Sequence, residues 1–116
     1  MTTQTIAPSD LPTPIRTYLD AHARRDVDAA IVHFAPEAEV TDEGNTYRGP
    51  AEVREFLSSA GSQFTYTSEL TGAQRIDNTH WLAVVHLEGD FPGRVADLRY
   101  RFTMAGDQIT RLAIVT

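Results

Sequence analysis

The sequence predicts a single α+β domain, with helices in its first half and a mainly antiparallel sheet in its second half. In the first half, apolar residues recur every three or four positions, which is the period of an amphipathic helix. In the second half they recur at every second position, which is the period of a half-buried strand. The length of 116 residues suits one compact domain and is too short for two ordinary ones.

The helical half opens with a polar segment. Residues 1–12 contain two prolines and several threonines, and they predict a flexible arm ahead of a domain formed by residues 13–116. A first helix is predicted from Thr13 to Arg25, since Pro14 is favoured in the first turn of a helix. Its apolar face carries Ile15, Tyr18, Leu19 and His22.

Two more helices and a short hairpin complete this half. Asp26 can cap a second helix, which the pattern carries through Phe34 and which Pro36 ends. A hairpin is predicted next, with strands at 38–42 and 46–48 around a Glu-Gly-Asn turn. Gly49 and Pro50 then open a third helix that Gly61 ends.

Four strands are predicted in the second half, so that the helices pack on one face of the sheet. They span residues 63–76, 80–88, 98–104 and 108–115. The opposite sheet face also carries apolar residues, which we expect to be exposed in a monomer: Leu82, Val84, Leu112 and Ile114. Because exposed apolar patches mark partner surfaces, we predict a homodimer through this outer face.

Composition excludes several functions. Ten basic residues against sixteen acidic ones give a formal charge of −6, which disfavours nucleic acid and anionic membranes as partners. Cysteine is absent, and the four histidines lack metal-ligand spacing, so we expect no metal and no thiol chemistry. No phosphate-binding loop is present, so we expect no nucleotide cofactor. Lacking a membrane-spanning run or a secretory signal, the chain is predicted to be cytoplasmic.

The stretch from Thr17 to Leu57 resembles the nuclear-transport-factor-2-like (NTF2-like) superfamily, and within it the SnoaL-like polyketide cyclases and the ketosteroid isomerases. The resemblance rests on a helical tyrosine, an Asp-x-Asp helix start, a strand ending in an aspartate, a Tyr-Arg-Gly sequence, and an Arg-Glu-Phe sequence in the following helix. These features are Tyr18, Asp26 and Asp28, Asp42, residues 47–49, and residues 54–56. It implies a cone-shaped fold, in which a curved sheet wraps the first helix and leaves an apolar pocket open at one end.

The resemblance also implies a catalytic pair. Tyr18 and Asp42 match residues that the ketosteroid isomerases use, the aspartate as general base and the tyrosine as hydrogen-bond donor to the enolate oxygen. A carboxylate at the mouth of an apolar cavity has a raised pKa, which suits it to accept protons near neutrality. The second acid of the isomerases is missing, because Leu98 occupies its position and strand alternation points Asp97 to the other face.

Several residues are predicted to line the pocket and bind substrate: Phe34, Phe56, Trp81, Val85, Leu98 and Tyr100. His22 follows Tyr18 by one helical turn on the same face, so it is a further candidate. These aromatic residues, and Tyr18 among them, also fit an ordinary core, and Asp42 also fits a turn. We therefore predict a cofactor-free isomerase or cyclase that moves a proton next to a carbonyl of a hydrophobic ring-containing molecule. The alternative is a non-catalytic ligand-binding or protein-interaction module.

Overall fold

The computed structural model describes residues 3–42, 44–59, 66–90 and 94–115. In this part of the chain, three α-helices and one short 3-10 helix accompany a single seven-stranded sheet. The elements are β1 (Gln4–Ile6), η1 (Pro8–Asp10), α1 (Thr13–Ala23), α2 (Val27–Ile31), β2 (Phe34–Asp42), β3 (Asn45–Arg48), α3 (Gly49–Ser59), β4 (Tyr66–Arg75), β5 (His80–Gly89), β6 (Val95–Ala105) and β7 (Gln108–Val115).

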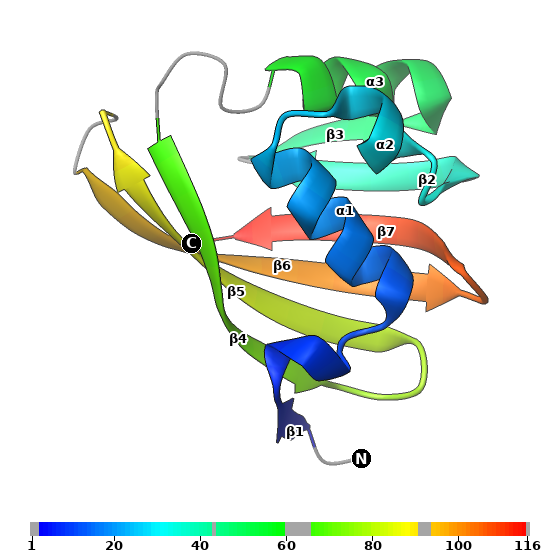
Figure 1. The fold of residues 1–116 in the computed structure, drawn as a ribbon. Coiled ribbons are helices and arrows are strands. Elements are labelled where there is room, and N and C mark those ends of the chain that lie inside the picture. The colour runs from blue at the N-terminus through cyan, green and yellow to red at the C-terminus, as the bar shows by residue number, and fades with distance from the viewer. Residues whose placement is uncertain (1–2, 43, 60–65, 91–93, 116) are drawn as a thin grey trace.

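The sheet is curved and mixed, with the strand order β1-β4-β5-β6-β7-β2-β3. Neighbouring strands are antiparallel except for β2 and β7, which run parallel. Figure 1 shows α1 lying across the concave face of the sheet, while α2 and α3 gather at the β2–β3 end. This arrangement confirms the predicted α+β class.

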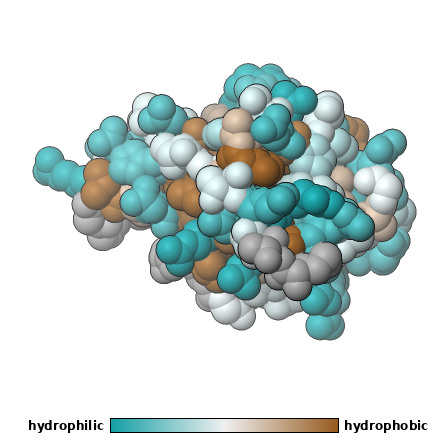
Figure 2. Space-filling view, turned by 90° about the horizontal axis from the view of Figure 1, so that it is seen from below, coloured by the Kyte–Doolittle hydropathy of each residue, from teal (hydrophilic) through white to brown (hydrophobic). Residues whose placement is uncertain are grey.

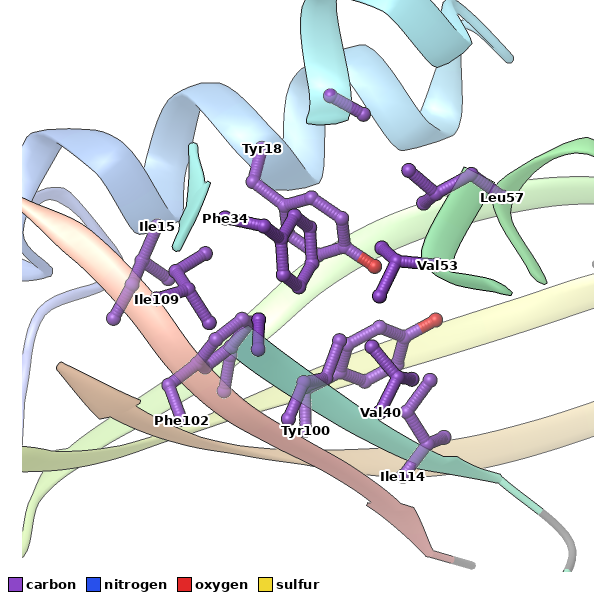
Figure 3. Packing of buried hydrophobic residues seen from close by; sticks show 14 of the residues in the cluster. Ile15, Tyr18, Phe34, Val40, Val53, Leu57, Tyr100, Phe102, Ile109 and Ile114 are labelled. Carbon is purple, nitrogen blue, oxygen red and sulfur yellow. The ribbon is translucent and has the colours of Figure 1, made fainter. Parts of the chain in front are cut away.

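The core fills the space between α1, α3 and the concave sheet face. From α1, Ile15 and Tyr18 are fully buried, and from the sheet Phe102 and Ile109 are almost completely buried. Figure 3 shows these side chains converging beneath α1, with Val53 of α3 beside them. On β5 and β6, the alternate apolar residues all lie in this core or pack against it: Trp81, Ala83, Val85, Leu87, Leu98, Tyr100 and Phe102.

The predicted second helix is too long. Asp26 does cap α2, because its side chain accepts a hydrogen bond from the Ala29 N–H at 3.1 Å, but α2 ends at Ile31. Phe34 begins β2, where it pairs with Ile109 of β7. Pro36 is tolerated in β2 because the β2–β7 register shifts between Phe34 and Glu39, leaving its missing N–H without consequence for the ladder.

The N-terminal segment also differs from the flexible arm that we expected. Gln4–Ile6 pair with β4 as strand β1, and η1 follows. Leu11 is then buried in the core at 2% exposure, which anchors the segment ahead of α1. Strand β1 and the burial of Leu11 could not be predicted from the sequence, because a three-residue edge strand and one leucine carry little periodic signal.

The expected apolar patch on the outer sheet face is wrong for Leu112 and Ile114. Both lie in the core, because β7 pairs them with Phe102 and Tyr100 of β6, and direct cross-strand partners share a face. Leu82 does lie on the outer side but is only 7% exposed, and Val84 is half-buried. Dimerisation through the outer face stays a prediction.

The surface seen from the β1 end is mostly polar. Figure 2 shows hydrophobic residues there as separate small patches among hydrophilic ones. Within the described residues, no helix is both long enough and apolar enough to cross a bilayer.

Candidate functional site

A cavity of about 290 Å³ lies between α1 and the concave face of the sheet. One wall comes from α1 and the other from β4, β5 and β6. Its described lining consists of Arg16, Leu19, Asp20, His22, Ala23, Ser68, Leu70, Val85, Leu87 and Tyr100.

The helix wall uses a face of α1 that differs from its core face. Arg16, Leu19, Asp20 and Ala23 follow one another at spacings of three, one and three residues, which places them along one side of a helix. Tyr18 and Ile15 lie on the neighbouring side and enter the core. One side of α1 therefore packs into the core, and the neighbouring side lines the cavity.

The sheet wall is built from cross-strand pairs. Ser68 pairs with Leu87, and Leu70 pairs with Val85, so these four side chains share the concave face. The β4–β5 register then shifts between Leu70 and Gly72. Such a bulge bends a strand, and it also lets both Leu70 and Ala73 face inward although they are three residues apart.

His22 is the polar residue most tightly held in this wall. Its imidazole stacks on the ring of Tyr18, with centroids 5.6 Å apart and 12° between the planes. Its other neighbour is Phe56 of α3, at 6.2 Å and 15°. Burial, and secondarily the positive charge of Arg25, lower the pKa of His22 below its usual 6.5. The ring is therefore neutral at pH 7, with one nitrogen able to donate and the other able to accept a hydrogen bond.

The charges beside the cavity are not balanced. Asp20 is engaged by Arg24, whose Nε lies 3.0 Å from its carboxylate. Arg16 instead donates from Nε to the Leu11 carbonyl at 3.1 Å and from Nη2 to the Thr13 hydroxyl at 3.3 Å. Among the described residues, no carboxylate forms an ion pair with Arg16. Arg16 thus brings a fixed positive charge to the cavity wall.

Tyr18, one of the predicted catalytic pair, lies behind the cavity wall. Its ring meets Phe34 edge-on at 5.2 Å and Phe102 at 5.8 Å, and its other face carries His22. In Figure 3 its hydroxyl points the same way as that of Tyr100, toward α3. Tyr18 is fully buried and is absent from the described cavity lining.

Asp42, the other member of the pair, ends β2 on the concave face. The register places it beside Ile114, which in turn pairs with Tyr100, so the three residues form one row across β2, β7 and β6. Two strand spacings separate Asp42 from Tyr100, about 10 Å between backbones. Asp42 is half-buried and is not part of the described cavity lining. The cavity therefore brings together Tyr100 and His22 rather than Tyr18 and Asp42.

The remaining predicted pocket residues divide into two groups. Val85 and Tyr100 line the cavity. The others belong to the core or pack against it: Phe34, Phe56, Trp81 and Leu98. Asp97 lies on the outer face as expected, since its carboxylate is 2.7 Å from Nδ1 of His86, and Leu98 pairs with Val85 on the concave side.

Several lining residues were not predicted: Arg16, Leu19, Asp20, Ala23, Ser68, Leu70 and Leu87. Spacing along α1 contained a signal for the first four, because they form a second helical face of mixed polarity. The sheet residues required knowledge of which strands face α1. Within the described part of the chain, no group of three acidic or histidine side chains is placed to hold a metal ion.

The curved mixed sheet around α1 and the cavity beneath it define a protein of the NTF2-like class. The model of the SnoaL-like domain family matches residues 15–112, so the chain belongs to this family. No curated protein matches the sequence significantly.

Solved structures agree with this assignment. A candidate polyketide cyclase from Sinorhizobium meliloti is 32% identical with a TM-score of 0.86, and the match covers 95% of this chain and all of that one. A Catenulispora acidiphila protein with a ketosteroid isomerase-like fold, in complex with trimethylamine, is 16% identical (TM-score 0.78; 90% and 85% covered). An NTF2-like protein from Cytophaga hutchinsonii is 8% identical (TM-score 0.70; 88% and 85% covered). The last two similarities establish the fold alone.

Proposed function

We propose that the protein binds a hydrophobic, ring-containing small molecule in the cavity beneath α1 and moves a proton next to its carbonyl group. The observation that supports this most is the cavity itself. Its floor is apolar, with Leu70, Val85 and Leu87, and polar groups enter it from α1. Binding sites for small molecules combine an apolar surface with a few such oriented polar groups.

The cavity volume limits the size of the ligand. About 290 Å³ lies just below the usual range for small-molecule sites, roughly 300–1,000 Å³. A ligand with one or two rings fits this space. The similarity to a candidate polyketide cyclase supports a ring-containing carbonyl compound as its chemical class.

The proposed reaction needs one base and one hydrogen-bond donor. Asp42 accepts a proton from the carbon next to the carbonyl, and the electron pair of that C–H bond moves onto the carbonyl oxygen. Tyr18 stabilises the resulting enolate, and the proton returns to a different carbon. Only protons move, so the step requires no redox cofactor. Tyr18 and Asp42 do not line the described cavity, so the step requires the carbonyl end of the ligand to extend from the cavity toward Asp42, which lies on the same concave face.

The isomerisation of a β,γ-unsaturated cyclic ketone, followed by ultraviolet absorbance, tests this proposal. We expect a rate well above buffer in the wild type, and a loss of about 10²-fold or more in Asp42→Asn, because a general base contributes roughly 10²–10⁴-fold. Ala23→Phe fills the cavity from the exposed side of α1 and should also abolish the rate.

Two matched variants serve as controls. Asp107→Asn changes an exposed aspartate in the turn before β7, and Ala51→Phe enlarges an exposed alanine of α3. Neither residue lines the cavity, so both variants should keep the wild-type rate. Equal background rates in all proteins would contradict the catalytic proposal.

A second candidate function, ligand binding without chemistry, is favoured by one observation. Leu98 stands on the concave face where the isomerases have a second acid, so one oxyanion donor is replaced by a methyl-bearing side chain. Removing one such donor costs roughly 10²–10³-fold in rate. A protein that binds ring compounds, shows no isomerisation, and loses binding in Ala23→Phe would fit this function.

A further inference from the structure

We propose that the cavity recognises a ring compound that carries an anionic oxygen, with Arg16 as the residue that holds this oxygen and His22 as a hydrogen-bonding partner inside. This inference deepens the proposed function and rests on it, because it requires a ring-binding cavity. It concerns recognition and is independent of which residue acts as the base.

The position of Arg16 is the first reason. Its guanidinium is held in place by the Leu11 carbonyl and the Thr13 hydroxyl, which together use two of its five N–H groups. The remaining donors belong to a cation with no ion pair among the described residues, on the wall of a largely apolar cavity. A planar guanidinium is well suited to bind a carboxylate or an enolate oxygen.

The charge balance on this side of the cavity is the second reason. Arg24 engages Asp20 at 3.0 Å and reaches Asp26 at 3.6 Å, so the one acidic residue of the described lining is offset. Arg25 lies close enough to act electrostatically on His22. The whole chain carries a charge of −6, yet the cavity wall carries Arg16, which forms no ion pair with a described carboxylate. The positive charge of Arg16 attracts an anionic ligand and repels a cationic one.

The setting of His22 is the third reason. The rings of Tyr18 and Phe56 both stack nearly parallel to its imidazole, which fixes the plane of the ring in a residue that lines the cavity. On the helix side, Arg16 and Asp20 line the same cavity as His22, and Arg25 acts on it electrostatically. The described sheet residues opposite contribute no charge to the lining, and their polar groups come from Ser68 and Tyr100. The ring edge is thus oriented before any ligand arrives.

A pair of probes of nearly equal shape tests the inference. 2-Naphthoate carries a carboxylate on two fused rings, and 2-acetylnaphthalene carries a neutral carbonyl on the same rings. We expect 2-naphthoate to bind about tenfold more tightly than 2-acetylnaphthalene, and Arg16→Gln to remove that preference by weakening the binding of 2-naphthoate. Arg99→Gln, which removes the same charge from the exposed outer face, should leave both affinities as in the wild type.

Nuclear magnetic resonance of the histidine side chains reads out His22 directly in the wild-type protein. We expect its ring signals to shift with both probes, and its pKa to rise on binding 2-naphthoate only, because a nearby negative charge favours the protonated ring. His80, at the start of β5 and outside the described lining, should not respond.

The possible failures are distinct. If both probes bind with equal affinity, if Arg16→Gln leaves the preference unchanged, or if His22 signals stay in place, the recognition inference is wrong and the ring-binding cavity stands. If neither probe binds at millimolar concentration, the proposed function falls together with the inference.

Discussion

At the scale of single residues, His22 shows how packing sets the pKa of a side chain. The sequence placed it one helical turn after Tyr18, and that spacing was enough to select it as a candidate. Its aromatic neighbour Phe56 and its place on the cavity wall depend on how α3 and the sheet surround α1. No local pattern contains this information, so its neutral state could not be predicted from the sequence.

Burial of His22 makes protein stability depend on pH. Because its pKa is lowered in the folded protein, the unfolded chain binds more protons once the pH falls through about 6.5. Stability should therefore decrease from pH 7.5 to pH 5.5, and it should decrease less in His22→Gln. Urea unfolding of both proteins at the two pH values measures this difference.

The comparison isolates His22 from the other histidines. Burial also lowers the pKa of His33, while the hydrogen bond to Asp97 raises that of His86, and both effects are present in the two proteins alike. An identical pH dependence in wild type and His22→Gln would contradict the buried position of this ring.

Asp77 gives a second prediction at this scale, in the turn between β4 and β5. Its carboxylate accepts hydrogen bonds from the Thr79 N–H at 2.9 Å and lies 2.8 Å from Nδ1 of His80. Chiefly the backbone hydrogen bond lowers its pKa from 3.8 to about 2. Its stabilising effect is thus present above pH 3.8 and is lost as the pH falls through about 2.

We expect Asp77→Asn to lower the melting temperature at pH 7, and the difference from wild type to shrink progressively below pH 3.8. Thermal unfolding followed by circular dichroism across this range measures it. Asp107→Asn, in the exposed turn between β6 and β7, is the control. A difference that is constant down to pH 2 would show that the charge of Asp77 is irrelevant.

At the scale of elements, the strands and helices with strong periodicity were predicted well. The first and third helices and the last three strands lie close to their predicted positions. The errors occurred where tertiary contacts decide. Phe34 follows a helical pattern, yet pairing with β7 places it in a strand, and a register shift in the same strand accommodates Pro36. The inward position of Ile114 likewise depends on register, which alternation alone left undetermined.

The N-terminal segment supplies a prediction at the element scale. Leu11 is the buried residue that links β1 and η1 to the core. Leu11→Ala should lower the free energy of unfolding by roughly 2–5 kcal/mol, as buried leucine truncations do. Val95→Ala, at a residue that is 54% exposed, should change it by about 0.5 kcal/mol or less. Similar values for the two variants in chemical denaturation would show that the segment is not anchored.

At the scale of the whole molecule, the outer sheet face carries the predicted dimer contact. Val84, Arg99 and Val115 form one row across β5, β6 and β7, and Leu82, Arg101 and Ala113 form the next. In each row, an arginine lies between two apolar side chains. Size-exclusion chromatography with light scattering should give twice the chain mass of 12.9 kDa, and Val84→Glu should give the single mass. A wild-type mass of 12.9 kDa would contradict the prediction.

In the candidate site too, some residues could be predicted from the local sequence pattern, whereas the positions of others depend on tertiary contacts. Val85 and Tyr100 were predicted as pocket residues and line the cavity, because strand alternation already placed them on the concave face. Arg16 and Ser68 were missed, since their common position depends on how α1 crosses the sheet. Tyr18 and Asp42 share the concave side of the fold, but neither lines the described cavity.

The proposed ligand site is the cavity between α1 and strands β4–β6. A chemical-shift map of backbone amides and side-chain methyl groups during titration with 2-acetylnaphthalene tests this assignment. We predict the largest changes at Leu19, Ala23, Leu70 and Val85, with little change at Val84 on the outer face. Changes concentrated on the outer face, or no changes at all, would contradict the claim.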